Sequence, residues 1–209
     1  MLFRLLTTAV LAGALATPAW AVPAPADLLF DFDTDAQGWT VLFDGTLTHE
    51  ATGGQSGGYL RLTDTSTNTD FELAAPASLA GNLSAYLGGT LQFQARNLDV
   101  LPDWPDFGRI TLTGAGMTVS FDGVPADQPP PDPQWHTYSV RLTTDNFTTN
   151  LPTVLADLTQ LSIKTEFHQG LGDDIGIDNI RISAVPESPT WALLLAGGLL
   201  LPALYRRRC

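Results

Sequence analysis

Cysteine is nearly absent from this chain of 209 residues: Cys209 is the single one, so no intrachain disulfide can form. Stability outside a cell must then come from a packed core or from bound metal. Positive charge is scarce as well, because 10 Lys and Arg face 22 Asp and Glu and leave a net charge of −12. A field of that sign repels phosphate backbones and anionic lipid surfaces, which excludes nucleic acid as a partner.

Sequence motifs for catalysis are missing too. His49, His136 and His168 are far apart and show no metal-ligand spacing, and neither a Gly-x-Ser-x-Gly elbow nor a phosphate-binding glycine loop occurs. Carboxylates are so numerous that no single pair stands out as a general acid and base. We therefore predict that the protein is not an enzyme. An enzyme acting on polysaccharide stays open as the alternative.

The first 21 residues have the three parts of a secretory signal peptide. Arg4 gives the positive region, an apolar stretch follows, and Ala19 and Ala21 form an A-x-A cleavage site. We predict that signal peptidase cleaves after Ala21. Residues 22–27 then form a linker in front of the folded domain.

The chain ends with an apolar stretch over residues 191–205 and three arginines at 206–208. Glycines and a proline interrupt the apolar stretch, and it is shorter than the ~20 residues that span a bilayer comfortably. The arginines would stay on the cytoplasmic side of the inner membrane. We predict a helix that enters the membrane transiently, and a plain membrane anchor is the alternative.

This tail, residues 185–209, resembles the PEP-CTERM sorting signal of Gram-negative bacteria that make exopolysaccharide. In that family, an exosortase recognises a Pro-Glu-Pro motif, an apolar helix and a basic end, and removes them. Ser188 stands where the family has its second proline, and Pro189 comes one place later. The resemblance implies a protein that is exported to the cell surface or beyond it. The matching residues are Val185, Pro186, Glu187, Arg206, Arg207 and Arg208.

Between these ends, residues 28–184 alternate apolar and polar positions in short runs separated by Gly, Pro, Asn and Asp. The pattern is typical of many short strands, so we predict an all-β domain, an antiparallel sandwich. Residues 78–88 and 151–160 favour short helices, the second with Pro152 in its first turn. The predicted strands lie at residues 27–32, 39–43, 57–62, 71–75, 89–97, 108–114, 117–123, 135–143, 160–167 and 175–183.

Three stretches of this region resemble the laminin IV type A (laminin B) domain. They are APASLAGNLSAYLGGTLQFQ, the strand WHTYSVRL, and VLADLTQLSIKTEF, in which Lys164 stands where the family often has Arg. The resemblance runs from about Phe30 to Ser183, and its ending IGIDNIRIS is also common in bacterial carbohydrate-binding sandwiches. It implies a jelly-roll-like β-sandwich of the galactose-binding and laminin IV type, extracellular, non-enzymatic and used in matrix or surface assembly.

Large aromatic residues recur at the strand spacing of a two-sheet core. We expect them to be buried between the sheets rather than to bind a ligand. They are Trp39, Tyr86, Phe93, Trp135 and Tyr138.

Calcium is the candidate ion. Asp31 and Asp33 alternate near the first strand, and Asp178 lies within the last one. The first and last strands of an antiparallel sandwich often lie side by side, which would bring together the hard oxygen ligands that Ca²⁺ prefers. Alternate aspartates are equally typical of the solvent face of a strand.

A sugar site needs exposed aromatic rings with polar neighbours. The loop LPDWPDF places Trp104 between two prolines, so we predict Trp104 and Phe107 as a platform for sugar stacking. The alternative is a tryptophan that closes the end of the sandwich.

Together these features predict an exported, exosortase-processed surface or matrix protein whose sandwich binds or packs into exopolysaccharide. A structural biofilm protein that assembles with itself and has no ligand is a further alternative.

Overall fold

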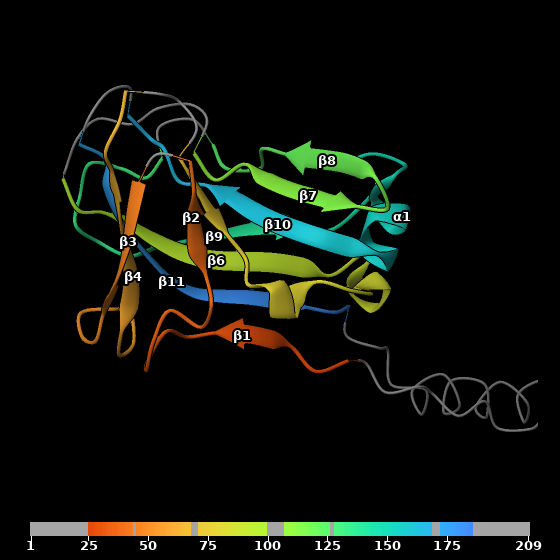
Figure 1. Cartoon of the computed structure of the whole chain (residues 1–209), viewed down its shortest axis with the longest axis horizontal. Helices are drawn as coiled ribbons and strands as arrows, with labels where there is room; N and C mark the ends of the chain where they lie inside the picture. Colours follow the sequence, from red (N-terminus) through yellow and green to blue (C-terminus); the bar gives the residue numbers. More distant parts are fainter. Residues whose placement is uncertain are drawn as a thin grey trace, which may run out of the picture. The chain divides into compact units, whose positions relative to one another are not determined.

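The computed structural model describes residues 25–43, 45–67, 71–99, 107–125, 128–168 and 172–185, and these residues form two antiparallel sheets. The six-stranded sheet has the order β3-β4-β11-β6-β9, with β1 paired to β11, and the five-stranded sheet has the order β2-β5-β10-β7-β8. Figure 1 shows the strands. They are β1 (Leu28–Phe30), β2 (Thr40–Leu42), β3 (Gly45–Glu50), β4 (Tyr59–Asp64), β5 (Glu72–Ala74), β6 (Thr90–Asn97), β7 (Ile110–Gly114), β8 (Met117–Phe121), β9 (His136–Arg141), β10 (Leu158–Lys164) and β11 (Asp174–Ser183).

The predicted all-β sandwich is confirmed, and ten of the strands lie where apolar and polar residues alternate. Sequence reasoning missed β3, whose sequence GTLTHE offers Leu47 as its one large apolar side chain. The strand forms because every residue of it pairs with β4, from Gly45 opposite Asp64 to Glu50 opposite Tyr59. It is an edge strand, and an edge strand needs little apolar surface of its own.

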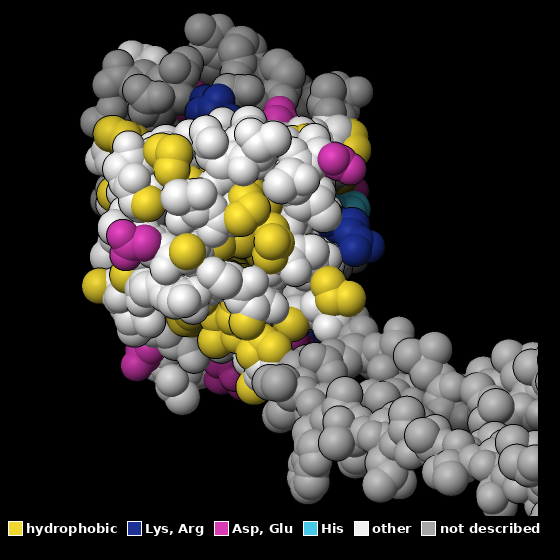
Figure 2. Space-filling view, turned by 90° about the vertical axis from the view of Figure 1, so that its right-hand side faces the viewer, with side chains coloured by type: hydrophobic (Ala, Val, Ile, Leu, Met, Phe, Trp, Pro, Cys, Tyr) yellow, Lys and Arg dark blue, Asp and Glu magenta, His cyan; other side chains and the backbone are white. Residues whose placement is uncertain are grey.

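Among the described residues, the helical turns lie at one end of the sandwich (Figure 1). The predicted helix at 151–160 is present as α1 (Leu151–Ala156), with Pro152 in its first turn. The segment at 78–88 forms two 3-10 turns instead, η1 (Ala77–Leu79) and η2 (Ser84–Tyr86). On the side of the molecule where α1 lies, hydrophobic side chains gather near the centre and charged ones lie around the margin (Figure 2).

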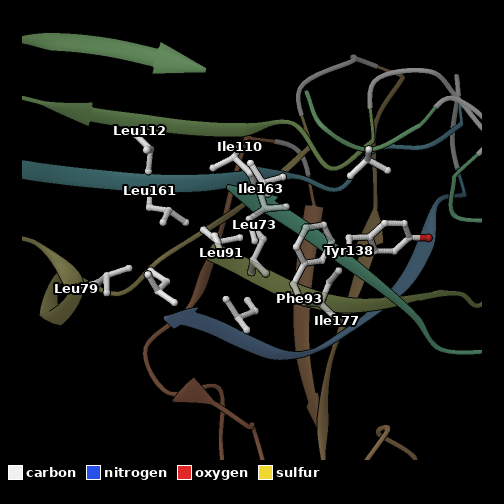
Figure 3. Close-up of a cluster of buried hydrophobic side chains, with 14 of the residues drawn as sticks. Leu73, Leu79, Leu91, Phe93, Ile110, Leu112, Tyr138, Leu161, Ile163 and Ile177 are labelled. Atoms are coloured by element: carbon white, nitrogen blue, oxygen red, sulfur yellow. The ribbon is translucent and has the colours of Figure 1, made fainter. Parts of the chain in front are cut away.

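The core lies between the two sheets. Leu91 and Phe93 of β6 and Ile177 of β11 point toward Ile110 of β7 and Ile163 of β10, and all five side chains are 0% exposed (Figure 3). Burying a large apolar side chain contributes roughly 1.5–3 kcal/mol. The domain therefore has the packed core that a chain without disulfides requires.

The two predicted processing signals lie outside the described residues. This applies to the signal peptide at 1–21 with Ala19 and Ala21, to residues 22–24 of the linker at 22–27, and to the sorting segment after Val185. Within the described ranges, no helix is long and apolar enough to span a bilayer.

Candidate functional site

The outer face of the six-stranded sheet is polar and carries the candidate site. Strand β6 alternates fully, because Leu91, Phe93, Ala95 and Asn97 are buried and the residues between them are partly exposed. Its outward residues are Thr90, Gln92, Gln94 and Arg96. The same alternation directs Thr137, Ser139 and Arg141 of β9, Arg61 and Thr63 of β4, and Arg181 and Ser183 of β11 to this face.

Two aromatic rings and an arginine meet at one end of this face, where β4 begins and β6 ends. Tyr59 and Trp135 pack edge to face, with ring centroids 5.6 Å apart. The guanidinium carbon of Arg96 lies 4.8 Å from the centroid of each ring. Attraction between the cation and the two rings holds the guanidinium in place. We call these three residues the aromatic–arginine cluster.

A glycine beneath the cluster makes room for it. Gly176 of β11 lies opposite Arg61 of β4 and opposite Arg96 of β6. A Cβ atom on Gly176 would lie 3.0 Å from the ring of Trp135 and 3.2 Å from the side chains of both Arg96 and Tyr59. Because Gly176 has no side chain, the rings can pack directly against the backbone of β11.

Amide side chains lie next to the cluster. Asn179 donates a hydrogen bond from Nδ2 to Oε1 of Gln94 at 2.8 Å, and Gln94 donates from Nε2 to the hydroxyl of Thr137 at 3.4 Å. Asn179 sits where the register of β11 against β6 shifts, with φ at +49°. Asparagine tolerates this left-handed conformation better than most residues do. The result is a row of hydrogen-bonding groups beside the two rings.

An ion pair borders the cluster. Arg61 donates from Nε and Nη2 to the carboxylate of Asp174, and this contact raises the pKa of Arg61 above its ordinary value. Asp174 is 6% exposed, so the ion pair with Arg61 offsets the cost of burying its carboxylate. Nearby, burial raises the pKa of Asp99, and the charge of Asp174 adds to the effect. The charges at this end of the face are thus fixed by mutual contact.

The sequence of most of the folded domain matches a known family. The laminin B (domain IV) family matches residues 72–192, more than half of the chain. The chain belongs to the laminin B (domain IV) family. This confirms the resemblance found in the sequence, although the match begins at β5 and not near Phe30. Among curated proteins, none matches this laminin B chain.

Several solved structures share the fold of this laminin B domain. The CBM22-1 xylan-binding domain from Paenibacillus barcinonensis aligns with a TM-score of 0.52 and 15% identity, covering 80% of this chain and 100% of its own. A family 11 carbohydrate-binding module of a cellulosomal cellulase from Clostridium thermocellum aligns with a TM-score of 0.50 and 14% identity, covering 78% and 97%. An exo-beta-agarase structure aligns with a TM-score of 0.53 and 17% identity, covering 78% of this chain and 26% of its own. At these identities the likeness establishes the fold.

The predicted sugar platform is not assembled as expected. Phe107 is 1% exposed and packs against Phe93 and Tyr138 of the core, with ring centroids 6.1 and 5.5 Å away. A ring buried in this way cannot stack on a sugar, so Phe107 is a core residue and not part of a sugar platform. Trp104 lies outside the described residues.

Trp135 was expected in the core and is partly exposed instead. Trp39, Tyr86, Phe93 and Tyr138 lie in the core as predicted, whereas Trp135 is outside it and partly exposed. Trp135 comes one residue before β9, and the alternation of that strand turns Tyr138 inward and leaves Trp135 on the outer face. The prediction of a core role for Trp135 is therefore wrong.

Two of the predicted calcium ligands approach one loop, residues 53–58. Asp178 accepts a hydrogen bond from the backbone N–H of Gln55 at 2.8 Å, and burial raises the pKa of Asp178, with the charge of Asp33 adding to the rise. Asp33 lies against Gly57, where a Cβ atom would collide with its carboxylate. Asp33 and Asp178 thus share a neighbourhood, but backbone N–H groups already occupy the oxygens of Asp178.

The third predicted ligand, Asp31, uses its Oδ1 elsewhere. It accepts hydrogen bonds from the backbone of Asp33 at 3.3 Å and from Nε2 of Gln37 at 3.1 Å. The expected pairing of the first and last strands is present, with Phe30 opposite Ile180. In the part of the chain that the structure describes, no three His, Cys, Asp or Glu residues are arranged to hold a metal ion. Calcium binding stays a prediction from residue type.

Sequence reasoning missed Tyr59, Arg96 and Gly176 as site residues. Each is far from the others in sequence, so no spacing connects them. One signal was available, because the alternation of GTLQFQARN places two glutamines and an arginine on one side of a strand. A polar face of this kind next to a tryptophan at residue 135 indicates a surface that binds polar ligands.

Proposed function

We propose that this protein is an exported, non-catalytic surface or matrix protein whose laminin B domain binds polysaccharide on the outer face of the six-stranded sheet. The observation that carries the proposal is the aromatic–arginine cluster of Tyr59, Arg96 and Trp135. Aromatic rings offer apolar faces on which pyranose rings stack. A partly exposed tryptophan braced by a tyrosine and an arginine is held ready for such a contact.

The neighbouring amides supply the second half of a sugar site. Gln94 and Asn179 hydrogen-bond each other and lie on the same outward side of the sheet. Fixed amide groups can donate to and accept from sugar hydroxyls, which gives orientation to a ligand that stacking alone would leave free to slide. The names of the structural neighbours support the proposal, since two of them are described as carbohydrate-binding or xylan-binding domains.

The two ends of the chain complete the proposal. A signal peptide at 1–21 would direct export, and the segment from Val185 to the arginines at 206–208 would hold the domain at the inner membrane until an exosortase releases it. Intact mass of the protein from its native host tests this step. Loss of both segments supports sorting, and a retained C-terminus identifies a membrane-tethered protein.

Binding is tested by titrating polysaccharides against the wild type, Trp135→Ala and Phe43→Ala. Phe43 is a matched control, because it is 68% exposed and follows β2 of the other sheet. Stacking on an aromatic ring is worth about 0.5–1.5 kcal/mol beyond burial, so Trp135→Ala should weaken binding about 2–12-fold or more. Equal losses in the two variants would refute the proposed site.

Two rival functions give different results in the same samples. A polysaccharide-active enzyme would release new reducing ends over time. A self-assembling protein without a ligand would bind none of the polysaccharides and would form larger species as its concentration rises.

A further inference from the structure

Arginine is distributed unevenly over the domain. Residues 25–185 contain 21 Asp and Glu but six Lys and Arg, namely Arg61, Arg96, Arg109, Arg141, Lys164 and Arg181. Four of these six lie on the outer face of the six-stranded sheet, on the neighbouring strands β4, β11, β6 and β9. A strongly acidic protein thus gathers most of its positive charge on the face that carries the proposed site.

The four arginines form two groups along the strands. Arg61 of β4 and Arg96 of β6 both lie opposite Gly176 of β11, which runs between their strands. The backbones of the two arginines are therefore about 10 Å apart. Arg141 and Arg181 line a cavity of about 360 Å³ at the other end of the face. Arg141 lies opposite Thr90, six residues along β6 from Arg96, so the two groups are separated by about 20 Å.

Two of the arginines already hold carboxylates. Arg61 is paired with Asp174, and Arg181 is paired with Asp27. Glu50 of β3 is a further acid near Arg61, and its negative charge contributes to the raised pKa of Arg61. These pairs show that guanidinium groups on this face bind carboxylates through Nε and Nη2 together.

The other two arginines have no carboxylate partner among the described residues. Arg96 is held by the rings of Tyr59 and Trp135, and its buried Nε–H has no hydrogen-bond acceptor in the described part of the chain. Arg141 is exposed and donates from Nη2 to the backbone oxygen of Gly88 at 3.1 Å. Each retains donors for an incoming anion.

The acids near this face do not pair with Arg96 or Arg141 in the part of the chain that the structure describes. Asp132 contacts His136, and Asp99 and Glu50 act on the Arg61–Asp174 pair. A neutral glycan carries no charge that could pair with a guanidinium group, whereas a carboxylate pairs with it and matches its planar fork of N–H donors.

Building on the proposed function, we infer that the ligand is an anionic polysaccharide, with carboxylates of uronic acid residues bound by Arg96 and Arg141. A long chain laid along β6 reaches both positions. Its sugar rings stack at Trp135, and its charges distinguish it from a neutral polymer of the same backbone.

The test compares polygalacturonate with carboxyl-reduced polygalacturonate, which keeps the backbone and loses the charge. The purified full-length protein is titrated with each, as wild type, Arg96→Gln, Arg141→Gln and Arg109→Gln. Arg109 is the matched control, because it pairs with Glu72 on the other sheet. Charge-assisted hydrogen bonds are worth about 1.5–3 kcal/mol, so each site variant should lose about tenfold or more in affinity.

The possible outcomes separate the inference from the proposed function. Tight binding of polygalacturonate that the site variants and carboxyl reduction weaken, and that Arg109→Gln leaves unchanged, supports the inference. Equal binding of both polymers overturns it and leaves polysaccharide binding standing. Equal or tighter binding of dextran sulfate overturns the assignment to uronic acids. No binding of any polymer overturns both.

The fold of the variants is checked by thermal unfolding. Arg141 is exposed, so Arg141→Gln tests the inference even where Arg96→Gln disturbs the rings. Arg96→Lys keeps the charge but loses the fork, and it should recover less than the full affinity.

Discussion

Asp173 is a buried carboxyl group whose protonation should make the stability of the domain depend on pH. It is 0% exposed, and its Oδ2 accepts hydrogen bonds from the backbone N–H groups of Phe167 and His168 at 3.1 and 3.2 Å. Its Oδ1 has no partner within the described residues. Burial raises the pKa of Asp173 to about 7, and the nearby charges of Glu166 and Asp64 contribute to the rise.

The direction and size of the effect follow from this pKa. The folded state binds the proton more tightly than the unfolded state, where the pKa is about 3.8. The contribution of the protonated Asp173 to the free energy of unfolding is therefore fully present below pH 3.8 and is lost as the pH rises through about 7. Each pKa unit is worth about 1.4 kcal/mol, so the whole loss is on the order of 4 kcal/mol.

Asp173→Asn isolates this contribution, because an amide stays neutral and keeps an oxygen for the two N–H groups. Urea unfolding is measured between pH 4 and pH 8 for the wild type, Asp173→Asn and the control Asp145→Asn, which changes an exposed aspartate. The variant at 173 should gain free energy of unfolding relative to the wild type as the pH rises, and the gain should level off above about pH 7. A difference between Asp173→Asn and wild type that stays constant with pH would show that the protonation of Asp173 is not linked to folding.

Three further substitutions test the sheet face and the core. Gly176→Val should displace the rings above it, cost about 1–3 kcal/mol of stability and abolish polysaccharide binding, and a variant that binds normally would contradict the packing described. Arg61→Gln leaves the buried carboxylate of Asp174 without its ion partner and should lower the free energy of unfolding by about 1–3 kcal/mol, whereas an unchanged melting temperature would show that the pair is not stabilising. Leu91→Ala removes a fully buried side chain and should cost about 2–5 kcal/mol in denaturant unfolding, with a loss below 1 kcal/mol arguing against a close-packed site.

The sandwich was predictable from the sequence because its strands obey one simple rule, burial at every second residue. Strand β6 follows the rule over eight residues, and Phe93, the β6 residue that was predicted to be buried, is buried. Strand β3 was not predicted, because its threonines and histidine form no apolar row. Its position is determined by pairing with β4. Tertiary pairing of this kind leaves no local trace in the sequence.

The candidate site was harder to predict, because its residues come from four separate segments. Tyr59, Arg96, Trp135 and Gly176 become neighbours once β4, β6, β9 and β11 are in register. Trp135 was assigned to the core since aromatic residues at strand spacing are usually buried. Trp135 and Tyr138 are three residues apart, so the alternation of β9 places their side chains on opposite faces, and burying Tyr138 leaves Trp135 outside the core.

A map of backbone amide chemical shifts during titration with an oligosaccharide of the bound polymer tests most directly where the ligand binds. Binding on the outer face of the six-stranded sheet should produce shifts on β4, β6, β9 and β11, together with a shift of the indole N–H of Trp135. Shifts confined to β2, β5, β7, β8 and β10 would place the ligand on the opposite sheet and contradict the proposed site.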